Sequence, residues 1–311
     1  MRARDLLLVI VTIGGMGAGL LAPGPALAFK DLTPYLLMGL LFLSFLRLDF
    51  AALLKPAPGG LAEVAIWSLV KLLVLPACLW GLAKWLWPEW ALAVLVLSAV
   101  STGVTCPFYA SLLGADLPRV LLMVVATSLA LPLSLPALIK LLVGAETAVP
   151  YADMFRLLAM IIFAPAALMG LVRRFWPQLV DFLGGVSFPL STALLFTISA
   201  VVFAPFGEHF ARDPGRFLAA TLLSFGLCGL YLAVGRLLPR LAPSILSPLT
   251  GMTALVYINN VLGVVFASRF LDFNSVLLCG CYLFPIYLAL LPLRWLTRHL
   301  ADAGSGSGSL G

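Results

Sequence analysis

A lysine in the middle of a long apolar segment is the residue whose chemistry most constrains this chain. Lys71 follows Ile66-Trp67-Ser68-Leu69-Val70 and precedes Leu72-Leu73-Val74-Leu75-Pro76. An ammonium group at the centre of a bilayer costs about 2.5–3.5 kcal/mol, and about 12 Å of helix separates Lys71 from either end of the segment, which is too far to reach water. Lys71 must therefore face the protein interior, beside an anion, carbonyl groups or water, or give up its proton.

Two roles are open for Lys71. As a strut, it would donate hydrogen bonds to carbonyl groups that broken helices leave free. As a functional group, it would exchange a proton at physiological pH, because burial disfavours the charged form of an amine. Glu63 lies about two turns nearer the membrane surface, and no acidic residue is evident at the depth of Lys71. The sequence therefore points to a helix C-terminus or a substrate carboxylate as its partner.

Hydroxyl, thiol and amide side chains gather where two other apolar segments contain helix-breaking residues. One segment has Ser101-Thr102-Gly103-Val104-Thr105-Cys106-Pro107, and the other has Pro248, Thr250-Gly251 and then Asn259-Asn260. Unwound backbone in a membrane must be covered by protein or water, and a half-helix N-terminus offers unpaired N–H groups to an anion. We expect a binding site here, although hydrogen bonding between helices is the alternative for each of these groups. The candidate substrate-binding residues are Thr102, Gly103, Thr105, Cys106, Asn259 and Asn260, and the candidate ion-coupling residues are Lys71, Thr127 and Ser128.

Membrane-spanning helices are the elements expected to hold these residues in place. Hydrophobic residues make up 62% of the 311 residues, charged residues only 10%, and the mean hydropathy is +1.11, whereas a soluble protein has about 25% charged residues. The chain is therefore predicted to be an all-α polytopic membrane protein. Its net charge of +6 comes from basic residues at the ends of apolar runs, which anchor helices in lipid and do not indicate nucleic-acid binding.

Ten transmembrane helices can be drawn, and they suggest an internal repeat. The fourth and ninth spans hold the helix-breaking residues, so each is the fourth of a group of five. Because five spans is an odd number, the second group would be inverted, and paired discontinuous helices in inverted halves indicate a transporter's binding site. The first five-helix repeat would cover residues 1–145 and the second 150–299, followed by a linker-like tail at 301–311. The predicted spans are 5–22, 33–54, 61–83, 89–114, 117–143, 151–172, 183–205, 215–237, 246–270 and 274–297.

The distribution of basic residues predicts the orientation. Ten spans place 11 Lys and Arg on one side and 7 on the other, so the positive-inside rule puts both termini in the cytoplasm of a bacterial-type inner (plasma) membrane. Residues 1–28 also resemble a secretory signal ending in Ala26-Leu27-Ala28, and cleavage there would leave nine spans.

Enzyme and metal signatures are absent from the sequence. The two histidines, His209 and His299, fall in a loop and a tail, and no metalloprotease, nucleophile-elbow or phosphate-loop motif occurs. The five cysteines all lie within apolar runs, which is typical of small hydrophobic residues. We therefore expect neither an enzyme nor a bound cofactor or metal, apart from a coupling ion, H⁺ or Na⁺.

The order of several motifs resembles the bile acid:sodium symporter family, as a divergent member related more distantly to arsenical resistance and auxin efflux carriers. The similarity covers residues 34–297. It implies two inverted repeats that form a panel and a core, alternating access around crossing helices 4 and 9, and transport of organic anions, usually with sodium. The motifs are Met38-Gly39-Leu40 with Leu48-Asp49-Phe50, Leu75-Pro76, Ser101-Thr102-Gly103 through Leu113-Gly114-Ala115-Asp116, Thr127-Ser128 with Pro132, and Asn259-Asn260-Val261-Leu262-Gly263.

The departures from that family concern its sodium sites. Where the family has a sodium-binding Ser-Asn pair, this chain has Cys106-Pro107, and a family glutamate falls near Leu255. A family glutamine aligns with Lys71, whose fixed charge can stand in for a sodium ion. We therefore expect a sodium-independent carrier for a small organic anion, working by proton coupling or uniport. The alternatives are a sodium-coupled carrier with a remodelled site and a non-transporting receptor or assembly subunit; the oligomeric state is open.

Overall fold

The computed structural model describes residues 3–46, 60–144, 150–207, 213–241 and 247–296. The described residues fold into helices, and their only β-type pairing is an isolated antiparallel bridge between Thr102 and Ile258. This all-helical architecture confirms the predicted class. The motif Leu48-Asp49-Phe50, both histidines and the tail at 301–311 lie outside the described residues.

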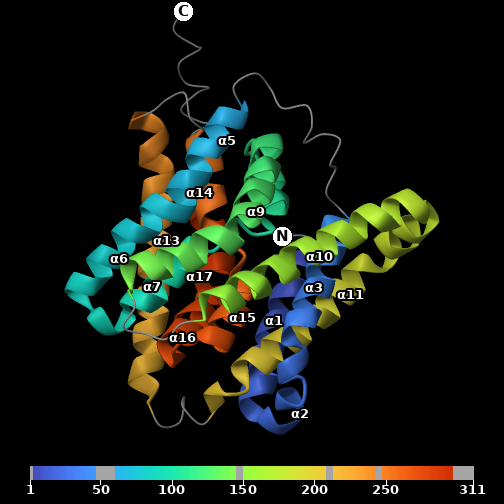
Figure 1. Cartoon of the computed structure of the whole chain (residues 1–311), viewed down its shortest axis with the longest axis horizontal. Coiled ribbons are helices and arrows are strands. Elements are labelled where there is room, and N and C mark those ends of the chain that lie inside the picture. The colour runs from blue at the N-terminus through green and yellow to red at the C-terminus, as the bar shows by residue number, and fades with distance from the viewer. Residues whose placement is uncertain (1–2, 47–59, 145–149, 208–212, 242–246, 297–311) are drawn as a thin grey trace, which may run out of the picture.

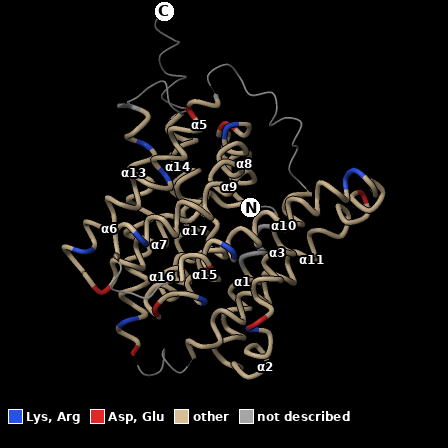
Figure 2. The backbone as a smooth tube through the Cα atoms, in the orientation of Figure 1, with Lys and Arg blue, Asp and Glu red and all other residues tan. Residues whose placement is uncertain are grey.

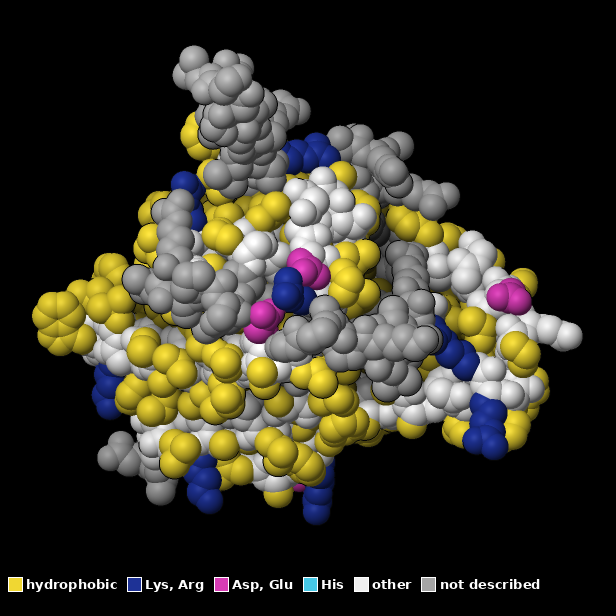
Figure 3. Space-filling view, turned by 90° about the horizontal axis from the view of Figure 1, so that it is seen from above, with side chains coloured by type: hydrophobic (Ala, Val, Ile, Leu, Met, Phe, Trp, Pro, Cys, Tyr) yellow, Lys and Arg dark blue, Asp and Glu magenta, His cyan; other side chains and the backbone are white. Residues whose placement is uncertain are grey.

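Six of the described helices are long and apolar enough to cross a membrane: Leu61–Leu86, Leu117–Leu142, Tyr151–Phe175, Pro177–Phe203, Pro214–Pro239 and Phe273–Leu296. Shorter apolar helices accompany them at Ile10–Leu21, Pro88–Ala99 and Asn260–Phe270. Charged residues lie mainly near the ends of helices (Figure 2), and hydrophobic side chains cover much of the face shown in Figure 3. Leu133, Leu222 and Leu291 are each more than 60% exposed, as expected for a surface that meets lipid. The chain is therefore a multi-pass membrane protein.

The helices pack as two groups (Figure 1). One group contains α1 (Ala3–Leu21), α3 (Thr33–Phe45), α10 (Tyr151–Phe175) and α11 (Pro177–Phe203). Here α1 approaches α11 so closely that a Cβ atom on Gly19 would overlap the carbonyl oxygen of Ala200. We call this group the panel group.

The second group, called the core group, surrounds two broken helices. It contacts the panel group where α9 (Leu117–Leu142) packs against α10 and where α15 (Asn260–Phe270) packs against α3, α10 and α11. Its members are α5 (Gly60–Leu69), α6 (Leu75–Leu86), α7 (Ala91–Ala99), α8 (Cys106–Leu113), α9 (Leu117–Leu142), α13 (Pro214–Leu241), α14 (Pro248–Val256), α15 (Asn260–Phe270), α16 (Phe273–Cys281) and α17 (Leu283–Leu288).

Both predicted interruptions are present, with one correction of position. The first separates α7 from α8 at residues 100–105, and the second separates α14 from α15 at residues 257–259. Pro248 and Thr250-Gly251, which the sequence suggested as breakers, lie inside α14. Pro248 does not break it, because it occupies the first turn, where a missing N–H costs nothing. Gly251 is a close-packing position, since a Cβ atom there would lie 2.7 Å from the carbonyl oxygen of Gly235.

Two further irregularities were not predicted. The span that contains Lys71 changes from α to π geometry at Val70–Val74, where the N–H of Leu75 donates to the carbonyl of Val70. Pro76 follows directly, and a proline cannot supply the N–H that a regular α-turn would use at this point. The last span, predicted at 274–297, has single turn residues at Tyr282 and Ala289 within the apolar helix Phe273–Leu296.

Candidate functional site

The two broken segments cross and satisfy each other's backbone. The Gly103 N–H donates to the carbonyl of Tyr257 at 2.7 Å, and the Asn259 N–H donates to the carbonyl of Ser101 at 2.8 Å. These bonds flank the bridge between Thr102 and Ile258. Unwound backbone that would be costly in lipid is therefore paired within the protein, as the location of the breaks required.

Gly103 is needed for this crossing because of its size. A Cβ atom at this position would lie 2.6 Å from the carbonyl oxygen of Ile258 and 3.0 Å from that of Tyr257. Any side chain would push the two segments apart and break the bridge. The residue expected to contact substrate thus has a packing role that the structure makes explicit.

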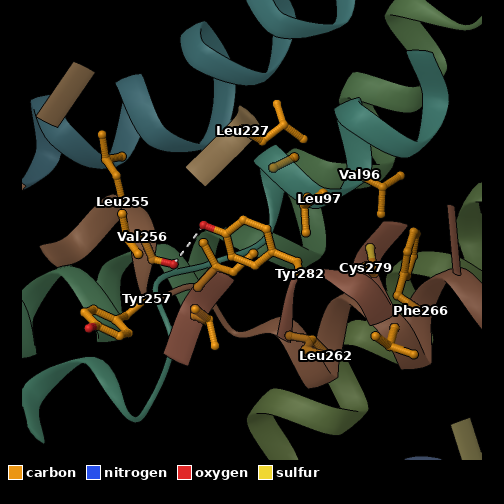
Figure 4. Close-up of a cluster of buried hydrophobic side chains, with 14 of the residues drawn as sticks. Val96, Leu97, Leu227, Leu255, Val256, Tyr257, Leu262, Phe266, Cys279 and Tyr282 are labelled. Carbon is orange, nitrogen blue, oxygen red and sulfur yellow. Dashed lines mark hydrogen bonds between the residues drawn. The ribbon is translucent and has the colours of Figure 1, made fainter. Parts of the chain in front are cut away.

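Neutral side chains cap the C-terminus of α14. The Thr102 hydroxyl donates to the carbonyl of Ala254 at 3.2 Å, and the Cys106 thiol donates to that of Thr253 at 3.4 Å. The Tyr282 hydroxyl donates to the carbonyl of Val256 at 3.1 Å (Figure 4). Carbonyls in the last turn of a helix have spare bonding capacity. These three side chains use it here, in addition to the N–H groups of Tyr257 and Ile258, which bond the carbonyls of Thr253 and Val256.

The two hydroxyls of α9 contact the other break. The Thr127 hydroxyl accepts a hydrogen bond from the Thr102 N–H at 3.0 Å and donates to the carbonyl of Met123 at 2.6 Å. The Ser128 hydroxyl lies 3.5 Å from that of Ser101. The structure therefore brings both candidate ion-coupling hydroxyls to the crossing.

The helices that follow the two breaks, α8 and α15, begin with residues that differ in exposure. Asn259 caps α15 without a side-chain hydrogen bond, and Asn260 begins the helix. Asn260 is 3% exposed, and neither its amide oxygen nor its amide nitrogen has a hydrogen-bond partner. Thr105, the residue before α8, is exposed. A buried amide with no partner is costly, so Asn260 is the candidate residue with the most unused bonding capacity.

The Lys71 side chain lies against the C-terminal end of α7, the helix that precedes the first break. Its ammonium nitrogen is fully buried and donates to the carbonyl of Ser98 at 2.8 Å. Ser98 is in the last turn of α7, where carbonyls lack partners and the helix dipole is negative. Among the described residues, no acidic side chain forms an ion pair with Lys71, so a helix C-terminus is the partner, one of the two that the sequence left open.

Several aromatic residues near the crossing carry no distinguishing signal in the sequence. The ring of Tyr231 lies 5.5 Å from the Lys71 nitrogen, and Tyr257 stacks on Tyr109 with ring centroids 3.8 Å apart. Nothing local to these tyrosines indicates such contacts, because their partners are more than 100 residues away in the chain.

At one end of the core group, Arg119 bridges two carboxylates. It pairs with Glu63 at 2.9 Å and with Asp116 at 2.7 Å. Glu63, the acidic residue of the span that contains Lys71, therefore forms its ion pair with Arg119 and not with Lys71. The carboxylate of Asp116 also caps α9 by accepting the N–H of Arg119.

The cysteines are single thiols. Cys106, Cys228, Cys279 and Cys281 are buried and Cys78 is exposed, all without disulfides. Within the described ranges no group of three or more histidine, cysteine or acidic residues is placed to hold a metal ion.

Comparison with known proteins gives one family. The sequence model of the sodium bile acid symporter family matches residues 32–212. This range includes Lys71, the first break and both α9 hydroxyls, and it stops before the second break. No curated protein matches the chain.

Proposed function

Since this chain belongs to the sodium bile acid symporter family, we propose that it is a secondary transporter of a small organic anion, in which Lys71 replaces a sodium ion. Transport would proceed by alternating access and without sodium, either coupled to protons or as uniport.

The contact between Lys71 and Ser98 is the observation that carries this proposal. A buried positive charge at the C-terminal turn of a broken helix provides what a bound sodium ion would provide: a cation among unpaired carbonyl oxygens. Lys71 makes this contact at 2.8 Å with complete burial. A permanently attached cation removes the need for a soluble one.

The arrangement of the helices supports ten spans in two inverted repeats. Each broken helix is followed by a further helix of the core group, α9 after the first and α16 after the second. The panel group would then stay in place while the core group moves past it, exposing the crossing to alternate sides of the membrane.

Asn260 supports an anionic substrate at the crossing. Its amide nitrogen is buried and unpartnered, and it begins α15, whose N-terminal N–H groups favour a carboxylate. Thr102 and Cys106 direct their donors to helix carbonyls, so their role is to shape the site. Gly103 serves the same end, while exposed Thr105 and the neighbouring Asn259 remain candidate substrate contacts.

The test is uptake by proteoliposomes that contain the full chain, using radiolabelled pyruvate, pantoate and taurocholate as probes. Sodium and pH gradients are imposed separately. We expect accumulation of at least one anion at the same rate when sodium is replaced by choline. Loss of uptake in choline would identify the sodium-coupled alternative, and saturable binding of a probe without accumulation would identify a receptor.

The role of Lys71 is tested by Lys71→Gln, with Lys84→Gln as the matched control. Lys84 is an exposed lysine in the same span. In the Lys71→Gln protein, which lacks the fixed cation, we expect uptake in choline to fall at least tenfold and sodium to restore part of it. Equal uptake by both variants in choline would overturn the surrogate role.

A further inference from the structure

The charge of Lys71 needs more compensation than one carbonyl offers. An ammonium group has three protons to donate, and a single hydrogen bond, to Ser98, is present. No carboxylate of the described residues pairs with it. An uncompensated buried charge is strongly destabilising, so other groups around the nitrogen must contribute.

Tyr231 is positioned to contribute through its ring. Its centroid lies 5.5 Å from the Lys71 nitrogen, within the range at which the negative face of an aromatic ring attracts a cation. Tyr231 has no solvent exposure, and such contacts are strongest when they are desolvated. It belongs to α13, which packs on α14 and α16 of the core group.

The hydroxyl of Tyr231 does not explain its presence. This oxygen is buried and lies near the Ser98 side chain, but the two are not in hydrogen-bond geometry. Tyr282 is the opposite case, because its hydroxyl donates to the carbonyl of Val256. The contact of Tyr231 with Lys71 is therefore made by its ring.

We propose that Tyr231 is the positioning residue for Lys71: its ring holds the ammonium group against the carbonyl of Ser98 and so ties α13 to the end of α7. The inference deepens the proposed function, since it rests on Lys71 acting as the resident cation. It also extends the site beyond residues 32–212, because Tyr231 lies in the second half of the chain.

The first test is a double-mutant cycle on thermal unfolding of the purified full chain in detergent, which requires no substrate. Tyr231→Leu should lower the Tm by several degrees, and Tyr231→Phe should stay within about one degree of the unmodified protein. In a Lys71→Met background, the effect of Tyr231→Leu should shrink by at least half. Tyr257→Leu removes a buried ring that stacks on Tyr109 and that contacts no lysine among the described residues, so it should cost the same in both backgrounds.

Equal losses from Tyr231→Leu in the two backgrounds, or an equal loss from Tyr231→Phe, would overturn the inference. These results stand even if no probe anion is transported, so failure of the inference and failure of the proposed function can be told apart. With a transported probe, Tyr231→Leu should lower the maximal uptake rate at least threefold, and Tyr231→Phe should restore it. A merely structural ring would not give this rescue together with dependence on Lys71.

Discussion

At the residue scale, the contacts of Lys71 and Gly103 limit which side chains can occupy these two positions. Lys71 contacts the Ser98 carbonyl and the Tyr231 ring, and a side chain shorter than lysine would not reach both. Position 103 requires glycine, because a Cβ atom there would lie only 2.6 Å from the Ile258 carbonyl oxygen. Reach and bonding capacity suit the first position, and small volume suits the second.

Gly103→Ala should therefore destabilise the protein by about 1–3 kcal/mol, the usual cost of overpacking, because the atoms that a methyl group would meet are backbone atoms that cannot rotate away. Gly226→Ala is the matched control: it lies inside α13, and a Cβ atom there would have nothing within 4 Å. Alanine is the better helix former, so this control should be neutral or slightly stabilising. Thermal unfolding in detergent measures both, and equal Tm values would contradict the packing role of Gly103.

At the element scale, Lys71 lies inside the π segment Val70–Val74. A π turn holds one more residue than the α-turn it replaces, which rotates the flanking helix by about 100°. Pro76 maintains it by lacking the N–H that would close a regular turn. We therefore expect the direction of the Lys71 side chain to depend on this π segment.

Pro76→Ala should let the segment tighten into a regular helix and turn Lys71 away from Ser98. We expect proteoliposome uptake in choline to fall at least tenfold, to the level of Lys71→Gln. The control is Pro165→Ala, a buried proline inside α10 of the panel group, which should have no such effect. Full uptake by Pro76→Ala would show that the proline does not determine where Lys71 points.

At the scale of the whole molecule, two helix groups meet along a limited boundary. The panel group is held together by the close approach of α1 to α11, and the core group by the crossing of its broken helices. Most helix–helix contacts join helices of the same group. The two groups could therefore move relative to each other while each keeps its own packing.

The orientation of the molecule in the membrane is a prediction of its charge distribution. Lys30 and Arg174 are exposed and fall on opposite sides in the ten-span arrangement. In a variant with all cysteines replaced by serine, a Lys30→Cys substitution should react with a membrane-impermeant maleimide on intact cells. An Arg174→Cys substitution should react only after permeabilisation. The reverse pattern would place both termini outside the cytoplasm.

The membrane class, the two interruptions and the burial of Lys71 all follow from the amino-acid sequence alone. They depend on local composition: a 62% hydrophobic chain cannot be soluble, and a mid-span lysine must be covered by protein. The predicted extent of the second break was wrong. Pro248 occupies the first turn of α14, where a helix tolerates proline, and Gly251 lies inside the helix where a Cβ atom would come within 2.7 Å of the Gly235 carbonyl oxygen.

Only the tertiary structure decides which groups cover Lys71 and which groups pair with the backbone of the two breaks. The Ser98 carbonyl is 27 residues from Lys71, and the Tyr231 ring and the bridge between Thr102 and Ile258 join residues more than 150 positions apart. Partners at such separations leave no periodicity in the sequence, because they are chosen by the way whole helices pack against one another.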